Sequence, residues 1–236
     1  MKRINLFYFI LLVLLLAALT GFSNWRSKQR KLEKVEVIFR QDAPRFLSTE
    51  IVNKLLIQSQ DSLFFKQKDM LALRVIEQEL LAHPTIKKAQ IYTVPQGNLY
   101  VEIEERTPLF RVIGPRAFYV DETGSEIPLS PQYSPEVPLF YGVITKENMK
   151  ALLELVSSFS RDTFLTNEVI DVRIENNQFV LGLRSFPFSV VWGRNRAFEQ
   201  KVEKLKRVCA YVSSTPEKEF SQINLIYKQQ VVARYN

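Results

Sequence analysis

The sequence contains few of the residues on which most enzymes and metal sites depend. Its 236 residues include one cysteine, Cys209, one histidine, His83, and seven glycines. A single cysteine excludes an internal disulfide, and these counts exclude metal sites built from Cys and His clusters. The P-loop, G-x-G-x-x-G, G-x-S-x-G and H-E-x-x-H patterns are missing as well. We therefore predict no enzyme activity, no cofactor and no small-molecule substrate.

A Cys–His nucleophile pair is the one reactive arrangement that these counts leave open. His83 precedes Pro84 at the end of a predicted helix, and Cys209 falls on the apolar face of another. Free cysteines on apolar faces usually pack as small hydrophobic residues. We therefore interpret both residues as structural.

The charge of the chain favours a partner near a membrane over nucleic acid. The formal net charge is +7, and 24% of the residues are charged. The basic residues are dispersed among acidic ones, except in the segment 26–34. Nucleic-acid binding proteins gather such residues into a patch or add aromatic motifs, and neither is found here. A basic segment beside a membrane suits anionic lipid.

One long apolar run dominates the N-terminal part of the chain. Residues 4–22 carry no charge, and as a helix they extend about 28 Å, close to the thickness of a hydrocarbon core. We predict a short tail at residues 1–3, a transmembrane helix in the lipid bilayer at 4–22 and a juxtamembrane linker at 23–34. A cleaved signal peptide and a buried core helix are the alternatives, but the run is long for the first and apolar on every face for the second.

Residues 35–106 have the pattern of a small α+β domain. Alternating apolar residues predict strands near 35–40, 85–94 and 99–106. Between the first two strands, Ser48 and Asp69 are good caps for two helices with apolar stripes. We expect this β-α-α-β-β unit to place both helices on one face of a three-stranded sheet.

Residues 107–236 predict a second, mixed α/β domain built on an antiparallel sheet. Short strands alternate with turns, and helices are predicted after Thr145 and over residues 196–211. Asp121 precedes Gly124 in a hairpin turn, which we favour over a role in acid catalysis. The lysines that flank the second helix are interpreted as a solvated face. Residues 221–227 and 231–235 predict two strands, or one bent strand, at the C-terminus. With the first domain, these features predict an α+β fold.

The segment from His83 to Phe110, HPTIKKAQIYTVPQGNLYVEIEERTPLF, resembles the end of the POTRA domain in the bacterial FtsQ/DivIB cell-division family. The pattern continues in order through FYVDETGSEIPL, VPLFYG, VVWGRNRAFEQKVEKLKRV and INLIYKQQVVARYN, so the resemblance covers nearly the whole chain. The closing motif departs from the family at Asn224 and Ile226, where an acidic residue and an arginine are usual.

The resemblance implies a single-pass protein of the inner (cytoplasmic) membrane, enriched at the division septum. Its N-terminus is expected in the cytoplasm and its domains outside, although the count of flanking Lys and Arg favours the opposite orientation. The implied partners are other membrane division proteins, the FtsB–FtsL pair. They are expected to add a strand to the last strand of the chain, as an unpaired strand edge allows. The expected partner-binding residues are Tyr227, Val231, Val232, Ala233, Arg234 and Tyr235.

Two other functions remain as alternatives. A POTRA domain also suits a secretion or outer-membrane assembly component that handles polypeptides, although tandem POTRA repeats and a barrel are not found in the sequence. A membrane-anchored cell-wall hydrolase would need a catalytic constellation, and none is recognisable.

Overall fold

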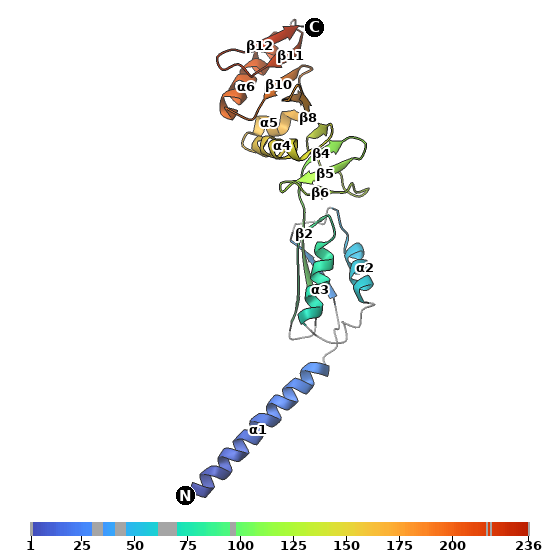
Figure 1. Cartoon of the computed structure of the whole chain (residues 1–236), viewed down its shortest axis with the longest axis vertical. Coiled ribbons are helices and arrows are strands. Elements are labelled where there is room, and N and C mark those ends of the chain that lie inside the picture. The colour runs from blue at the N-terminus through green and yellow to red at the C-terminus, as the bar shows by residue number, and fades with distance from the viewer. Residues whose placement is uncertain are drawn as a thin grey trace. The chain divides into compact units, whose positions relative to one another are not determined.

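The computed structural model describes residues 2–29, 35–40, 46–60, 70–94, 98–215, 217 and 219–235. In the first three helices, α1 (Lys2–Gln29), α2 (Thr49–Gln60) and α3 (Met70–Leu81), it describes side chains only for residues 8–23, 49–56 and 73–81. The chain divides into two compact units, Met1–Glu105 and Arg106–Asn236 (Figure 1). Each unit is considered by itself below.

The apolar run at the N-terminus forms a helix, α1. In the part of the chain that the structure describes, no helix is both long and apolar enough to cross a membrane. The predicted transmembrane helix is therefore not confirmed. The helix continues to Gln29 and so includes the first residues of the predicted linker, while residues 30–34 lie outside the described part.

The first unit has the predicted β-α-α-β-β order. Its strands are β1 (Val35–Phe39), β2 (Ile86–Thr93) and β3 (Leu99–Glu105), which follow one another in the sheet as β1-β3-β2. β3 is central, parallel to β1 and antiparallel to β2. Parallel strands need a long crossover, and α2, α3 and β2 lie in the connection between β1 and β3. The predicted three-stranded arrangement is confirmed.

The core of the first unit lies between the helices and one face of this sheet. β3 alternates strictly, with Leu99, Val101 and Ile103 fully buried. They contact the buried apolar stripes of α2 and α3, including Val52 and Leu80. The opposite face of β3 carries glutamates, which gives the half-buried pattern of a sheet covered on one side. Ser48 caps α2 as predicted, because its Oγ accepts a hydrogen bond from the Ile51 amide at 3.3 Å.

The second unit is built on one nine-stranded sheet, ordered β12-β11-β10-β9-β8-β7-β4-β5-β6. The strands β6 and β12 lie at opposite ends of the sheet (Figure 1). The helices are α4 (Lys146–Phe159), α5 (Thr163–Glu168) and α6 (Phe198–Ser214). The strands are β4 (Pro108–Ile113), β5 (Phe118–Asp121), β6 (Glu126–Ile127), β7 (Leu139–Tyr141), β8 (Val169–Glu175), β9 (Gln178–Leu183), β10 (Ser189–Gly193), β11 (Phe220–Asn224) and β12 (Val232–Tyr235).

The prediction of an antiparallel sheet is wrong, because the sheet is mixed. The pairs β4–β7, β7–β8 and β10–β11 are parallel, and the others are antiparallel. The helices explain two of these pairs: α4 and α5 connect β7 to β8, and α6 connects β10 to β11. A helix that crosses over between neighbouring strands returns the chain in the same direction and so produces a parallel pair.

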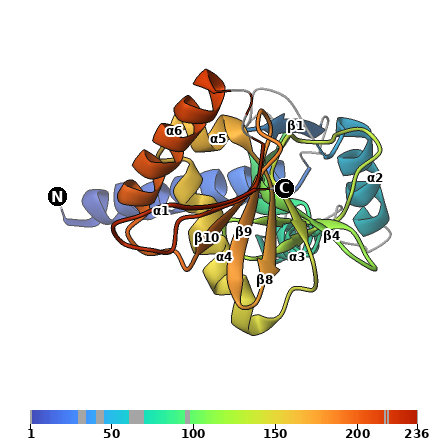
Figure 2. The ribbon, with the colours of Figure 1, turned by 90° about the horizontal axis from the view of Figure 1, so that it is seen from above.

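The register of the strands aligns one row of apolar residues across most of this sheet. The row runs through seven strands in the order Val112, Phe140, Val172, Leu181, Val190, Ile223 and Ala233. All but Ala233 belong to the core that also takes in the buried faces of α4, α5 and α6. Figure 2 shows α4 and α6 on the same side of β8, β9 and β10. The row thus marks the helix-covered face, and it ends at the edge strand β12.

Candidate partner-binding edge

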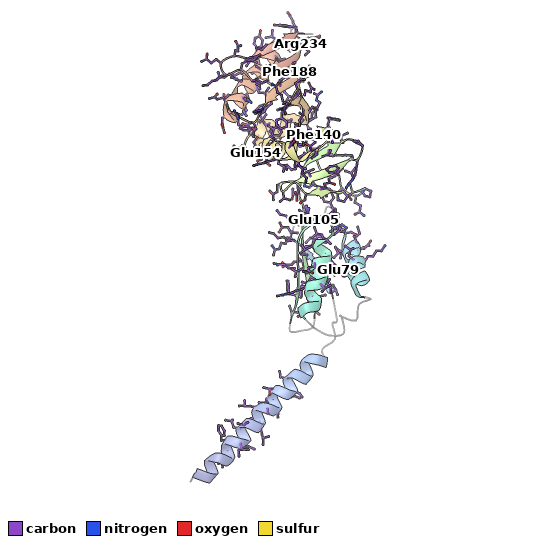
Figure 3. The ribbon with its side chains drawn as sticks, viewed as in Figure 1. Glu79, Glu105, Phe140, Glu154, Phe188 and Arg234 are labelled. Atoms are coloured by element: carbon purple, nitrogen blue, oxygen red, sulfur yellow. The ribbon has the colours of Figure 1, made fainter. Side chains whose placement is uncertain are left out.

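The last strand of the chain is also the last strand of the sheet. β12 pairs with β11 on one side, and no described strand pairs with its other side. Arg234, labelled in Figure 3, lies on β12, whereas Phe140 lies on a strand inside the sheet. Each residue of β12 is exposed. Along its outer side, backbone N–H and C=O groups therefore form a row of donors and acceptors that another chain can pair with.

The side chains of β12 alternate between two environments. Ala233 continues the apolar row, and Tyr235 packs on the buried Phe220 with ring centroids 4.9 Å apart. Val232 and Arg234 point to the opposite face because strand side chains alternate. Val232 is 44% exposed and Tyr235 is 58% exposed, so both side chains are accessible to a partner.

The loop between β11 and β12 places Tyr227 and Val231 before this edge. Tyr227 is exposed, whereas Val231 packs against the core of the unit. The loop starts in a turn in which the Asn224 side chain accepts a hydrogen bond from the Ile226 amide at 3.0 Å. At this position Asn224 shapes the turn by a neutral hydrogen bond. The structure thus brings the six predicted residues into one loop and strand, and their role in binding stays a prediction.

A hollow of about 430 Å³ lies beside the loop. Among its described lining residues five are basic and none is acidic: Arg194, Arg196, Lys201, Lys204 and Lys228. Such a lining attracts carboxylates more than cations. The sequence pattern did not reveal this hollow, because its residues come from α6, from the ends of β9 and β10 and from three separate loops.

Of the α6 lysines expected on a solvated face, Lys201 is buried, whereas Lys206 is partly exposed but paired. The Lys201 side chain is buried and donates to the carbonyl oxygens of Trp192 and Arg194. Lys206 forms an ion pair with Asp162, with Nζ and Oδ2 2.7 Å apart. Only tertiary contacts distinguish these lysines from fully solvated ones, so their positions along the helix could not predict their partners.

The surroundings of Cys209 do not favour reactivity. Cys209 is buried, and burial, with a smaller effect of the Glu168 charge, raises the pKa of its thiol to about 12. A thiol with that pKa is almost entirely protonated at neutral pH and is a poor nucleophile. His83 belongs to the first unit, where its Nδ1 lies 2.8 Å from Thr85 Oγ1.

Asp121 has the turn role that its sequence context predicted. Its Oδ1 accepts hydrogen bonds from the Thr123 and Ser125 amides and from the Thr123 hydroxyl, closing the turn between β5 and β6. Its other oxygen, Oδ2, lies 2.7 Å from Arg106 Nη1. These hydrogen bonds and the ion pair give both oxygens of a buried carboxylate a partner, so we assign Asp121 a role in stability.

A β-α-α-β-β unit followed by a mixed sheet with an open terminal edge defines an α+β protein with two domains. An open edge of this kind can accept a strand from another chain. Comparison with known families agrees with this description. Residues 32–104 match the POTRA-like domain, and residues 107–234 match the family described as "FtsQ/DivIB, C-terminal related".

The second match covers more than half of the chain, so the chain belongs to the FtsQ/DivIB family. A curated relative, "Cell division protein FtsQ" of Rhodothermus marinus, is 27% identical over 240 aligned positions. The alignment covers 92% of this chain and 82% of the relative. The family resemblance predicted from the sequence is confirmed.

Proposed function

We propose that this protein is a non-enzymatic scaffold of the cell-division machinery that captures other membrane division proteins by strand addition to β12. The observation that carries the proposal is the position of β12, which is exposed and pairs with a described strand on one side only. Membership in the FtsQ/DivIB family supports the scaffold role. It also favours division over the handling of secreted polypeptides.

The proposed partners are the FtsB/FtsL-like proteins of the same cell. An added strand would bond to the outer backbone of β12, and Tyr227 and Tyr235 would flank it as aromatic anchors. The basic hollow beside the loop suits an acidic residue next to the partner strand. The six residues proposed for binding are Tyr227, Val231, Val232, Ala233, Arg234 and Tyr235.

Substitutions in β12 test strand addition. Val232→Glu introduces a charge beside the docking edge, and Tyr235→Ala removes the aromatic anchor. We expect each variant to lose co-purification of the FtsB/FtsL-like pair, with circular dichroism unchanged. Val143→Glu is the matched control, because Val143 is 69% exposed and lies in another loop. Full capture by both β12 variants would exclude this edge as the binding site.

We also propose that residues 4–22 anchor the protein in the inner membrane, with the N-terminus in the cytoplasm and both units outside. The run carries no charge, and in α1 its described apolar side chains are all exposed, Leu14 at 63%. Burial in lipid would remove this surface from water. Alkaline phosphatase fused to the C-terminus should be active in intact cells, and an inactive but stable fusion would reverse the orientation. A fluorescent fusion should gather at the septum.

A further inference from the structure

The edge strand β12 is short and has few side-chain contacts with the rest of its unit. It has four exposed residues. Beyond its ladder with β11, it is held by the Tyr235–Phe220 ring contact and by the Ser221 hydroxyl, which lies 3.2 Å from the carbonyl oxygens of Arg234 and Tyr235. Exposed terminal strands of this length tend to open locally. A docking edge has to be in place before a partner arrives, so the contacts that fix its position matter.

Lys204 of α6 holds the loop that leads into β12. Its Nζ donates to two successive carbonyl oxygens, those of Tyr227 at 2.7 Å and Lys228 at 2.8 Å. Hydrogen bonds from an ammonium group are stronger than neutral ones. This single side chain therefore ties the middle of the loop to a helix that is packed into the core.

Lys201 lies one turn earlier on the same side of α6, at the spacing that makes helical residues neighbours. Its Nζ donates to the carbonyl oxygens of Trp192 at 2.6 Å and Arg194 at 2.7 Å. These two residues enclose Gly193, which has a positive φ of 73°. Lys201 thus fixes the turn that follows β10 in the way that Lys204 fixes the loop before β12.

The turn held by Lys201 lies directly against the loop held by Lys204. A Cβ on Gly193 would be 2.9 Å from Cγ1 of Ile226, closer than real side chains approach. In addition, the Leu225 amide donates to the Val191 carbonyl at 3.0 Å. The loop before β12 therefore packs against the end of β10 and is hydrogen-bonded to α6.

We propose that Lys201 and Lys204 form a lysine clamp that positions β12 for strand addition. Both are positioning residues, because they bind carbonyl groups of this chain and act on the partner through the strand that they hold. The part of this inference that concerns a partner rests on the proposed function. The part that concerns the order of β12 does not depend on it.

Hydrogen exchange of the full-length protein in detergent tests the clamp without a partner. In Lys204→Met, the β12 amides that pair with β11 should exchange about ten- to a hundredfold faster, because hydrogen bonds from a charged group contribute in this range. Lys204→Arg keeps a cationic donor and should restore most of the protection. Lys206→Met is the matched control: it removes an equally short lysine contact from the same helix, to Asp162. Unchanged exchange in β12, or equal acceleration throughout the second unit, would overturn the clamp.

Capture of the FtsB/FtsL-like pair separates the clamp from the proposed function. If both hold, Lys204→Met weakens capture, Lys204→Arg restores it, and Tyr235→Ala and Val232→Glu abolish it. If the β12 variants still capture the pair while Lys204→Met accelerates exchange, strand addition fails and the clamp stands. If the β12 variants lose capture while Lys204→Met changes neither capture nor exchange, the clamp fails and strand addition stands.

Discussion

Glu105 ends β3 with a carboxylate that is buried at 1% exposure. Its Oε1 accepts hydrogen bonds from the Phe46 amide at 2.9 Å and the Leu47 amide at 2.7 Å. Both of these residues are buried as well. We expect Glu105→Ala to cost the first unit about 2–4 kcal/mol, because two buried N–H groups lose their acceptor. Chemical denaturation, followed by a probe in the first unit, measures this loss.

The matched control for this prediction is Glu79→Ala. Glu79 is exposed on α3, and Figure 3 labels both glutamates. Removing an exposed carboxylate usually changes stability by less than about 0.5 kcal/mol. Glu105→Gln keeps one acceptor oxygen and should fall between the two. Equal stability of Glu105→Ala and Glu79→Ala would contradict the role given to Glu105.

Asp121 makes the second unit sensitive to acid. Burial alone would raise the pKa of this carboxyl, but hydrogen bonds from Thr123, Arg106 and the Ser125 amide hold it below the ordinary value. The unfolded chain therefore binds the proton more readily than the folded one. The stabilisation is present above the unfolded pKa, about 4, and is lost as the pH falls through the folded pKa.

In urea titrations from pH 7 to pH 2, wild type should lose more stability than Asp121→Asn, so that the two curves converge in acid. Glu203→Gln serves as a control, because the ion pair that it removes, between Glu203 and Arg207, is exposed and 4.0 Å long. Exposed pairs contribute little. Curves for wild type and Asp121→Asn that stay parallel down to pH 2 would show that the Asp121 pKa is not shifted by folding.

The sequence alone does not show which charged residues are buried and which are exposed. Glu105 follows two half-exposed glutamates in one strand, and Lys201 lies among lysines that reach the surface of α6. The residue types are identical, and only the surrounding fold decides which carboxylate or ammonium is buried. Asp121 was predicted correctly because its turn is local and needs no knowledge of distant residues.

At the scale of the elements, the helices and most strands were predictable because their signals are local. Thr145 caps α4 in a capping box with Asn148, and the alternation of β3 marks its buried face. The pairing of strands is not local. Alternation with a period of two residues predicts a strand. It does not indicate which strand pairs with it or whether the pair is parallel, so the parallel pairs of β7 and β10 were missed.

The short helix α5 is capped by Asp162 at its N-terminus. Asp162 accepts hydrogen bonds from the Phe164 and Leu165 amides and also pairs with Lys206 of α6. We expect Asp162→Ala to destabilise the second unit by about 1–2 kcal/mol, the usual cost of a lost cap. Asp162→Asn retains the cap and removes the charge, so it should cost about half as much. Urea denaturation of both variants measures the difference, and equal losses would assign the whole effect to the ion pair.

At the scale of the whole molecule, the two units have separate cores. One gathers around Leu99, Val101 and Ile103, and the other around the apolar row of the nine-stranded sheet. The predicted boundary between residues 106 and 107 lies one residue from the division at Glu105. The sequence predicts that boundary because Thr107-Pro108 interrupts two runs of alternating residues. The candidate binding edge was predicted only through the family resemblance, because the sequence of a final strand does not reveal whether its outer side is paired.

Separate cores predict that the units unfold as separate cooperative blocks, so a single unfolding free energy does not describe the chain. Hydrogen exchange of the full-length protein in increasing denaturant should show two groups of amides with different midpoints. Glu105→Ala should lower only the midpoint of the first unit, and Asp121→Asn only that of the second. If either substitution shifts both groups equally, the two units form one cooperative block. Independent blocks would let substitutions that loosen β12 and its loop leave the POTRA-like unit intact.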